Sequence, residues 1–148
     1  MTDKSEIGTY WWNEFQKAFN SAYEDSFETQ RKLEYESLKK TIEYFNSTAN
    51  AKELSDLMFA HWIKPPIFEE SKQFFEMCPV PIYVVSNIDR DDVLKAIEYH
   101  GLKPNGIFTS EDAKSYKPRK ELFQFALNST GLSAEQVVHL SLIHISEP

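Results

Sequence analysis

Proline and glycine are distributed unevenly along this chain of 148 residues, and their placement constrains the fold more than any other feature of the sequence. Residues 1–64 contain no proline and a single glycine, whereas all seven prolines and the other three glycines come later. Because both residue types interrupt regular structure, a long stretch without them that is rich in Glu, Lys, Leu and aromatic residues favours helices. The sequence therefore predicts a helical region over residues 1–64 and short alternating elements over residues 65–140.

The apolar residues of the first region predict three helices. They recur at steps of three and four, which places them on one face of each helix. The three stripes are Trp12, Phe15, Phe19, Tyr23 and Phe27; Tyr35, Leu38, Ile42 and Phe45; and Leu54, Leu57, Met58 and Trp62. We expect these stripes to pack together in the core of a small helical bundle, although a bundle of this size can also serve as a lid.

The second region alternates between strand and helix patterns. A near-continuous apolar run at residues 80–86 has the length of a strand that is covered on both faces, and shorter strand candidates lie at 107–109 and 137–140. Helices are predicted at 68–77, at 89–100 with Gly101 after its end, and at 118–128 with Gly131 beyond it; Ser133 and Gln136 have the spacing of a capping box. This alternation predicts a parallel α/β sheet with helical crossovers.

Composition excludes several classes of protein. With 41% apolar residues the chain can bury a core, and a net charge of −7 from 16 basic and 23 acidic residues does not suit a nucleic-acid-binding surface. No run of 18 apolar residues is present, and residues 1–12 lack the pattern of a signal peptide. The single cysteine, Cys78, excludes an intrachain disulfide and suits a reducing compartment. We expect a cytoplasmic protein without nucleic-acid or membrane partners, and the sequence leaves its oligomeric state open.

Three polar residues near predicted strand ends are candidates for binding an anion. Parallel sheets place their sites at the carboxyl ends of strands, where Ser86 and Asn87 are followed directly by a helix whose N-terminal end favours negative charge. Lys117 lies in a loop before a helix that Pro118 begins, and its ammonium can neutralise a phosphoryl group or a carboxylate. The alternatives are a helix-capping role for Ser86 and Asn87 and a solvated surface position for Lys117.

The segments VPIYVVSNIDRDDVLKAIEYHGL and IFTSEDAKSYKPRKELFQFAL resemble the haloacid dehalogenase (HAD) superfamily of hydrolases, and the resemblance extends over roughly residues 9–140. In that family a serine or threonine, often followed by asparagine, ends the second core strand, as Ser86 and Asn87 do here. A lysine in a Lys-Pro context precedes a later helix, as Lys117 does. The resemblance implies a partial HAD-like, Rossmannoid α/β fold, with a parallel sheet that has helices on both faces, an N-terminal helical cap (1–64) and a partial core (65–140).

The resemblance also implies chemistry. A HAD hydrolase uses an aspartate nucleophile and forms a covalent aspartyl intermediate; in phosphatases Mg²⁺, held by carboxylates, balances the charge of the transferring group. Ser86 would then hydrogen-bond the phosphoryl oxygens, and Lys117 would stabilise the nucleophile and the developing charge. We expect the parent enzyme to be a magnesium-dependent phosphatase of a small phosphorylated molecule. The alternatives are a haloacid dehalogenase-type hydrolase and a non-catalytic interaction module, the latter favoured by the aromatic first half.

Two parts of the family pattern are missing from the sequence. No apolar strand ending in Asp-x-Asp-x-Thr precedes Trp11, and the Asp-x-Asp spacing at residues 89–92 suits the first turn of a helix better than catalysis. No acidic metal-binding motif follows residue 140. The ending LSLIHISEP resembles translated sequencing-adapter sequence, so we expect a truncated fragment with a non-native tail at 141–148. His139 and His144 are therefore not a metal pair, and we assign no metal ligand in this chain.

These departures predict that the chain as it stands does not turn over substrate. In the presence of magnesium, we expect hydrolysis of a generic aryl phosphate at the rate of a Lys117→Ala control, because neither a nucleophile nor metal carboxylates are supplied. Hydrolysis by the unaltered chain above that control would contradict this expectation.

Overall fold

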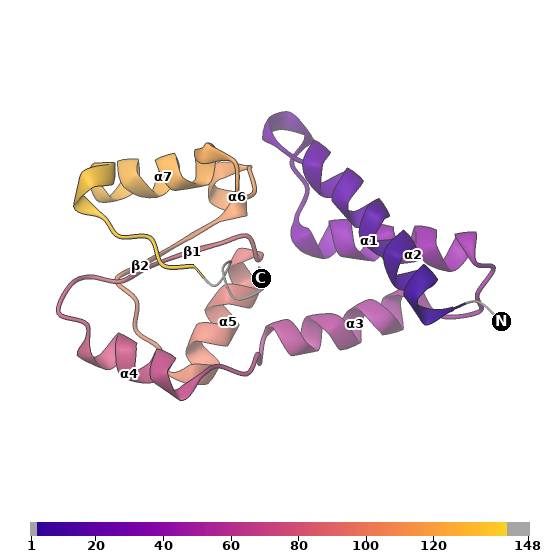
Figure 1. Cartoon of the computed structure of the whole chain (residues 1–148), viewed down its shortest axis with the longest axis horizontal. Coiled ribbons are helices and arrows are strands. Elements are labelled where there is room, and N and C mark those ends of the chain that lie inside the picture. Colours follow the sequence, from indigo (N-terminus) through magenta and orange to yellow (C-terminus); the bar gives the residue numbers. More distant parts are fainter. Residues whose placement is uncertain (1–2, 142–148) are drawn as a thin grey trace.

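A computed structural model describes residues 3–141, which form a helical region and an α/β region (Figure 1). The helical region consists of α1 (Lys4–Ser21), the short 3-10 helix η1 (Glu24–Ser26), α2 (Gln30–Tyr44) and α3 (Ala51–Trp62). The α/β region consists of α4 (Glu69–Met77), β1 (Tyr83–Ser86), α5 (Arg90–His100), β2 (Gly106–Thr109), α6 (Ser110–Ala113), α7 (Lys120–Thr130) and the 3-10 helix η2 (Ala134–Gln136). None of the helices in the described part of the chain is both long and apolar enough to cross a bilayer.

The three helices expected in the first region are confirmed, but α1 is shorter than its stripe. It ends at Ser21, so Tyr23 and Phe27 lie in the connection that contains η1. At its start the side chain of Asp3 accepts a hydrogen bond from the backbone N–H of Ser5. Phe15 of α1 is buried in one cluster with Ala22, which follows the helix, and Leu33 of α2, as expected for a packed face.

The buried faces of α2 and α3 differ from the predicted stripes. The buried residues are Leu33, Glu34, Ser37 and Thr41 of α2 and Ser55 and Phe59 of α3. The hydroxyls of Ser37 and Thr41 donate to the carbonyls of Leu33 and Ser37, at 2.6 and 2.8 Å, so small residues can be buried without unpaired polar groups. Small residues allow close approach of helices, and the larger apolar residues then lie at the margins; Leu57 is 72% exposed.

The sheet consists of β1 and β2, which pair in parallel with Val84 opposite Ile107 and Ser86 opposite Thr109. In Figure 1, α7 lies on one side of these strands, and α4 and α5 lie on the other. This arrangement confirms the predicted parallel α/β class with helices on both faces. Gly101 and Gly131 follow α5 and α7 with φ of 66° and 70°, the left-handed conformation expected of residues that end a helix.

Three local predictions for the second region need correction. The first strand begins at Tyr83 rather than Val80, and Pro118 precedes α7, whose N-cap is Arg119. Residues 137–140 are not a strand, and Val138 is 87% exposed. A strand requires hydrogen bonds to a neighbouring strand, and within residues 3–141 β1 pairs with β2 alone. The run of apolar residues therefore has the composition of a strand but no strand beside it.

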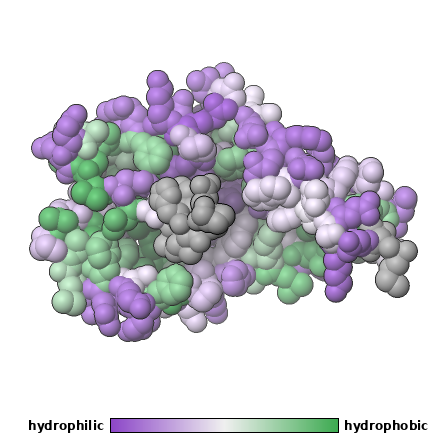
Figure 2. Space-filling view, viewed as in Figure 1, coloured by the Kyte–Doolittle hydropathy of each residue, from purple (hydrophilic) through white to green (hydrophobic). Residues whose placement is uncertain are grey.

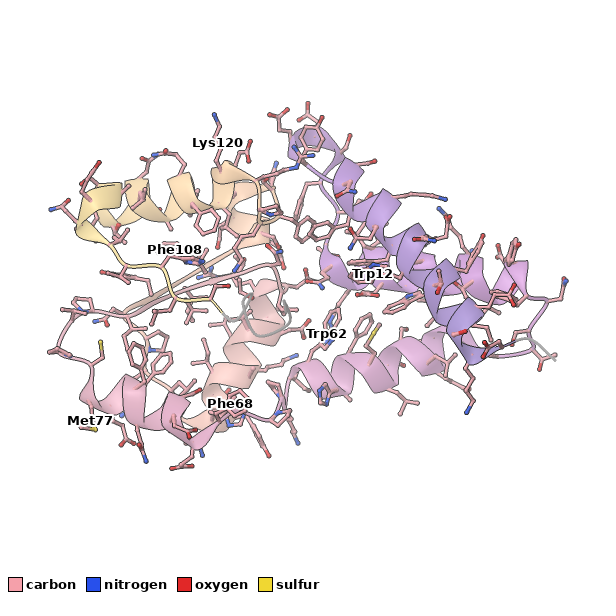
Figure 3. The ribbon with its side chains drawn as sticks, in the orientation of Figure 1. Trp12, Trp62, Phe68, Met77, Phe108 and Lys120 are labelled. Atoms are coloured by element: carbon pink, nitrogen blue, oxygen red, sulfur yellow. The ribbon has the colours of Figure 1, made fainter. Side chains whose placement is uncertain are left out.

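Apolar side chains remain on the outside of the α/β region. Figure 2 shows them over this part of the molecule, whereas the surface over α1 and α2 is mainly hydrophilic. Phe68 and Met77, at the two ends of α4, are 67% and 79% exposed, and Met77 extends away from the sheet (Figure 3). Burial in the described residues is thus concentrated between the two regions rather than around α4.

Two aspartates of the α/β region join it to the helical region. The carboxylate of Asp89 accepts the backbone N–H groups of Gln30 (2.7 Å) and Arg31 (3.0 Å) at the first turn of α2. Asp92 accepts the Nε and Nη2 of Arg31 at 2.7 and 2.6 Å, a bidentate pair. The sequence predicts that Asp89 caps its own helix, α5; the carboxylate caps α2 instead, because the fold places the two helix starts together.

The pair of Arg31 and Asp92 gives a prediction about stability. The side chain of Asp92 is 1% exposed, so its removal leaves the Arg31 guanidinium without its partner. We expect Asp92→Ala to lower the free energy of unfolding in urea by about 2 kcal/mol, the range for hydrogen bonds to charged groups. The matched control is Asp56→Ala, which breaks an exposed pair with Lys52 and should cost less than about 0.5 kcal/mol. Equal losses in the two variants would contradict the prediction.

The buried carboxyl of Glu34 gives a second prediction. Glu34 is 6% exposed, its Oε2 has no hydrogen-bond partner among residues 3–141, and burial raises the pKa of its carboxyl from 4.5 to about 7. The native state then holds the Glu34 proton more tightly than the unfolded state does. The contribution of this proton to the free energy of unfolding is therefore complete below pH 4.5 and is lost as the pH rises through about 7. At pH 8 we expect Glu34→Gln to be more stable than the unaltered chain by about 1–3 kcal/mol.

The advantage of Glu34→Gln should disappear as the pH falls from 7 to 4.5, which thermal or urea unfolding at several pH values can measure. Glu36→Gln is a suitable control, because Glu36 lies on the exposed side of the same helix. A stability difference that does not change with pH would refute the assignment of this titration to Glu34.

Candidate anion-binding site

Ser86 lies at the carboxyl end of β1, where the sequence predicts the site. It is half-buried, and its Oγ accepts the backbone N–H of Ile88 at 3.1 Å, which turns the chain toward α5. The hydroxyl therefore has a structural use as well. Its own O–H has no acceptor among residues 3–141, so Ser86 can still donate a hydrogen bond to an anion at the strand tip.

Lys117 reaches the same strand end from the loop before α7. Its ammonium Nζ donates to the carbonyl oxygen of Val85 at 2.8 Å, directly beside Ser86 along the chain. Burial lowers the pKa of Lys117 below its ordinary value, and within residues 3–141 this ammonium forms no ion pair with a carboxylate. The half-buried ammonium thus lies at the residue before Ser86, without a carboxylate partner among residues 3–141.

Asn87 connects the strand tip to the lysine loop through its side chain. Its Nδ2 donates to the Lys117 carbonyl at 3.1 Å, and its Oδ1 accepts the Lys117 backbone N–H at 2.7 Å. The hydroxyl of Ser110 donates to the Asn87 carbonyl at 2.9 Å. Asn87 is a predicted substrate-binding residue; both ends of its side-chain amide are bonded to the backbone of Lys117, so the amide holds the lysine loop.

The two acidic residues of α6, at the same edge of the sheet, form hydrogen bonds within the protein. Asp112 accepts the backbone N–H of Thr109 at 2.7 Å and pairs with Arg90 at 2.9 Å, while Glu111 accepts the backbone N–H of Arg90 at 2.9 Å. Across residues 3–141 no three His, Cys, Asp or Glu side chains are grouped so as to hold a metal ion. His139 packs edge-on against Phe123, and His144 lies outside the described residues.

An apolar cavity of about 290 Å³ opens beside the strand tip, with Ser86 in its wall. Its other walls come from the end of α3, the connection to α4, and α5; they include Trp62, Ile67, Ile88, Val93, Ile97 and Leu102. A mostly apolar space next to a few polar groups is typical of small-molecule sites. Ser86 belongs both to the strand tip and to the cavity wall, which also contains Asp92; Lys117 is not among the residues that line the cavity.

Sequence reasoning missed Tyr116, which is 2% exposed and lies next to Lys117. Its hydroxyl donates to the carbonyl of Glu28 at 2.6 Å, in the connection between η1 and α2. The only available signal was its place in SYKP, because the partner lies 88 residues earlier in the chain.

Comparisons with known proteins identify the fold. No family model and no curated protein matches the sequence. The structure is similar to that of the L-2-haloacid dehalogenase PA0810, with a TM-score of 0.72 and 14% identity over 88% of this chain and 59% of that one. This chain has a partial HAD-like α/β fold. It is also similar to the defluorinating L-2-haloacid dehalogenase Rha0230, with a TM-score of 0.69 and 18% identity over 90% of this chain and 57% of that one.

A further HAD structure supports the same conclusion and carries a ligand. It is the L-2-haloacid dehalogenase of Xanthobacter autotrophicus with chloropropionic acid covalently bound, matched with a TM-score of 0.69 and 16% identity over 88% of this chain and 55% of that one. The chain therefore spans less than two thirds of the length of these dehalogenases. The comparisons confirm the partial HAD-like α/β fold with a helical cap that the sequence predicts.

Proposed function

We propose that this chain provides the anion-binding part of a HAD-type hydrolase site, of the haloacid dehalogenase type, with residues 1–64 as its cap and 65–140 as its partial core. The observation that carries the proposal is the ammonium of Lys117, which lies half-buried at the tip of β1 beside Ser86 without a carboxylate partner within residues 3–141. A desolvated cation of this kind favours an anionic ligand, because electrostatic attraction is stronger where water is excluded. The carboxylate of a 2-haloacid is such a ligand.

The resemblance supplies the reaction. An aspartate carboxylate attacks the halogen-bearing carbon, the carbon–halogen bond breaks, halide leaves with the electron pair, and water then hydrolyses the ester to a hydroxy acid. Within residues 3–141, Asp89 and Asp92 are committed to α2 and Arg31, so neither is the nucleophile. We infer that Ser86 and Lys117 bind and orient the carboxylate of the substrate, and that the adjacent cavity takes its alkyl group.

A magnesium-dependent phosphatase is the second candidate, because a hydroxyl and an ammonium at one strand tip also suit a phosphoryl group. The described residues do not form a set of carboxylates suited to Mg²⁺, so we derive no step through a metal. The three dehalogenase neighbours favour the first candidate. In either case the expected partner is a small anionic molecule, and the single Cys78 is in keeping with a cytoplasmic location.

Anion titration by isothermal calorimetry tests the proposal. We expect 2-chloropropionate to bind, and Lys117→Ala to weaken binding about tenfold or more, as for loss of a charge-assisted hydrogen bond. Ser86→Ala should weaken it about threefold. The matched control is Lys120→Ala, since Lys120 is exposed at the start of α7 and extends outward (Figure 3).

Each outcome separates the candidate functions. Tighter binding of 2-chloropropionate than of inorganic phosphate supports the dehalogenase type, and the reverse order supports the phosphatase. Equal affinities of the Lys117→Ala and Lys120→Ala variants would overturn the anion site and favour a non-catalytic interaction module.

A further inference from the structure

The loop that carries Lys117 is held from two sides. On the sheet side, the amide of Asn87 holds both the N–H and the carbonyl of Lys117. On the helical side, the residues before and after Lys117 and Pro118 contact the connection between α1 and α2. Tyr116 donates to the Glu28 carbonyl, and Arg119 lies over the Tyr23 ring at 3.9 Å. The lysine therefore lies at a junction of the helical and α/β regions.

Tyr116 is the deeper of the two helical-side anchors. Its ring is buried against Phe19 and Phe27, with ring centroids 4.5 and 5.2 Å away, and it belongs to the same core cluster as Phe15 and Leu33. Burial raises the pKa of its phenol above the ordinary value, so the hydroxyl keeps its proton and remains a hydrogen-bond donor. The 2.6 Å bond to the Glu28 carbonyl thus fixes the loop to the helical region.

We propose that Tyr116 is a positioning residue for Lys117. The Tyr116 hydroxyl fixes the loop to the helical region and so sets where the Lys117 ammonium lies at the tip of β1. This inference rests on the proposed function, in which Lys117 binds the anion. Lysine has a long, flexible side chain, so the place of its ammonium depends on how firmly its backbone is held. Asn87 sets that backbone relative to the sheet, and Tyr116 sets it relative to the region that covers the site.

The carboxylates near the loop bond to groups other than the Lys117 ammonium, so the Lys117 pKa depends mainly on its burial. Glu111 and Asp112 on α6 are both bound to Arg90, and Glu121 on α7 accepts the hydroxyl of Ser115 at 3.2 Å. The pKa of Lys117 is lowered by burial, with no ion pair acting on it among residues 3–141. A change in its burial should therefore appear directly as a change in its pKa.

Tyr116→Phe tests the inference, because it removes the hydroxyl and keeps the ring. The Lys117 pKa is measured by NMR of the lysine side chains without added anion, and affinity for 2-chloropropionate is then measured by calorimetry. We expect the pKa to rise toward the ordinary lysine value as the loop gains solvent, and the affinity to fall about two- to tenfold, the range for loss of one neutral hydrogen bond.

Two control variants separate positioning from packing. Tyr83→Phe changes a partly exposed tyrosine on β1 whose hydroxyl has no partner within residues 3–141, and should alter neither quantity. Phe19→Leu weakens the core contact with Tyr116 but keeps the hydroxyl bond, so it should lower stability and leave the Lys117 pKa unchanged. If Tyr116→Phe alone does not fold, the comparison is made in the Glu34→Gln background at pH 8.

The outcomes distinguish this inference from the proposed function. An unchanged Lys117 pKa in folded Tyr116→Phe overturns the positioning role, even if Lys117→Ala still weakens anion binding. A raised pKa in Tyr116→Phe, in a chain that binds neither 2-chloropropionate nor phosphate, supports the positioning of Lys117 and overturns the anion site. A pKa that rises equally in Phe19→Leu also overturns the inference, since packing alone would then set it.

Discussion

The carboxylate of Asp89 at the first turn of α2 is the contact on which the arrangement of the two regions depends. The first N–H groups of a helix have no partner within the helix, and Asp89 accepts two of them while Asp92 holds the Arg31 side chain. Asp89 is buried, and its removal from water raises the pKa of the carboxyl despite these bonds. The free N–H groups at the start of α2 and the buried carboxylate of Asp89 thereby supply each other's hydrogen-bond partners across the two regions.

The candidate site depends on this arrangement because Lys117 lies at a second contact between the same regions. Tyr116 reaches the connection just before α2, whose N-terminus Asp89 holds. The two contacts fix the connection and the loop relative to β1, and the ammonium then lies on the Val85 carbonyl next to Ser86. In the proposed function, anion binding therefore depends on the helical region as well as on the sheet.

Much of this could be predicted from residue order, because the signals are local. Gly101 and Gly131 predict helix ends and the apolar run predicts the first strand, both of which the structure contains. The resemblance to the HAD superfamily singles out Ser86 and Lys117 as candidates. The burial of Ser37 and Thr41 could not be predicted from hydropathy, since it follows from the close approach of helices. The apolar residues 137–140 show the opposite case: their composition favours a strand, but strands form only beside a partner.

The sequence alone determined most of the element types, the parallel class of the sheet and the identity of the hydroxyl and ammonium candidates, because propensity, capping and spacing act between residues close in the chain. The tertiary structure decided which helix Asp89 caps, that Asn87 holds the lysine loop, and that Tyr116 is bound to Glu28. These contacts join residues 30 to 88 positions apart, and nothing in a local pattern specifies which distant carbonyl or N–H group will meet a given side chain.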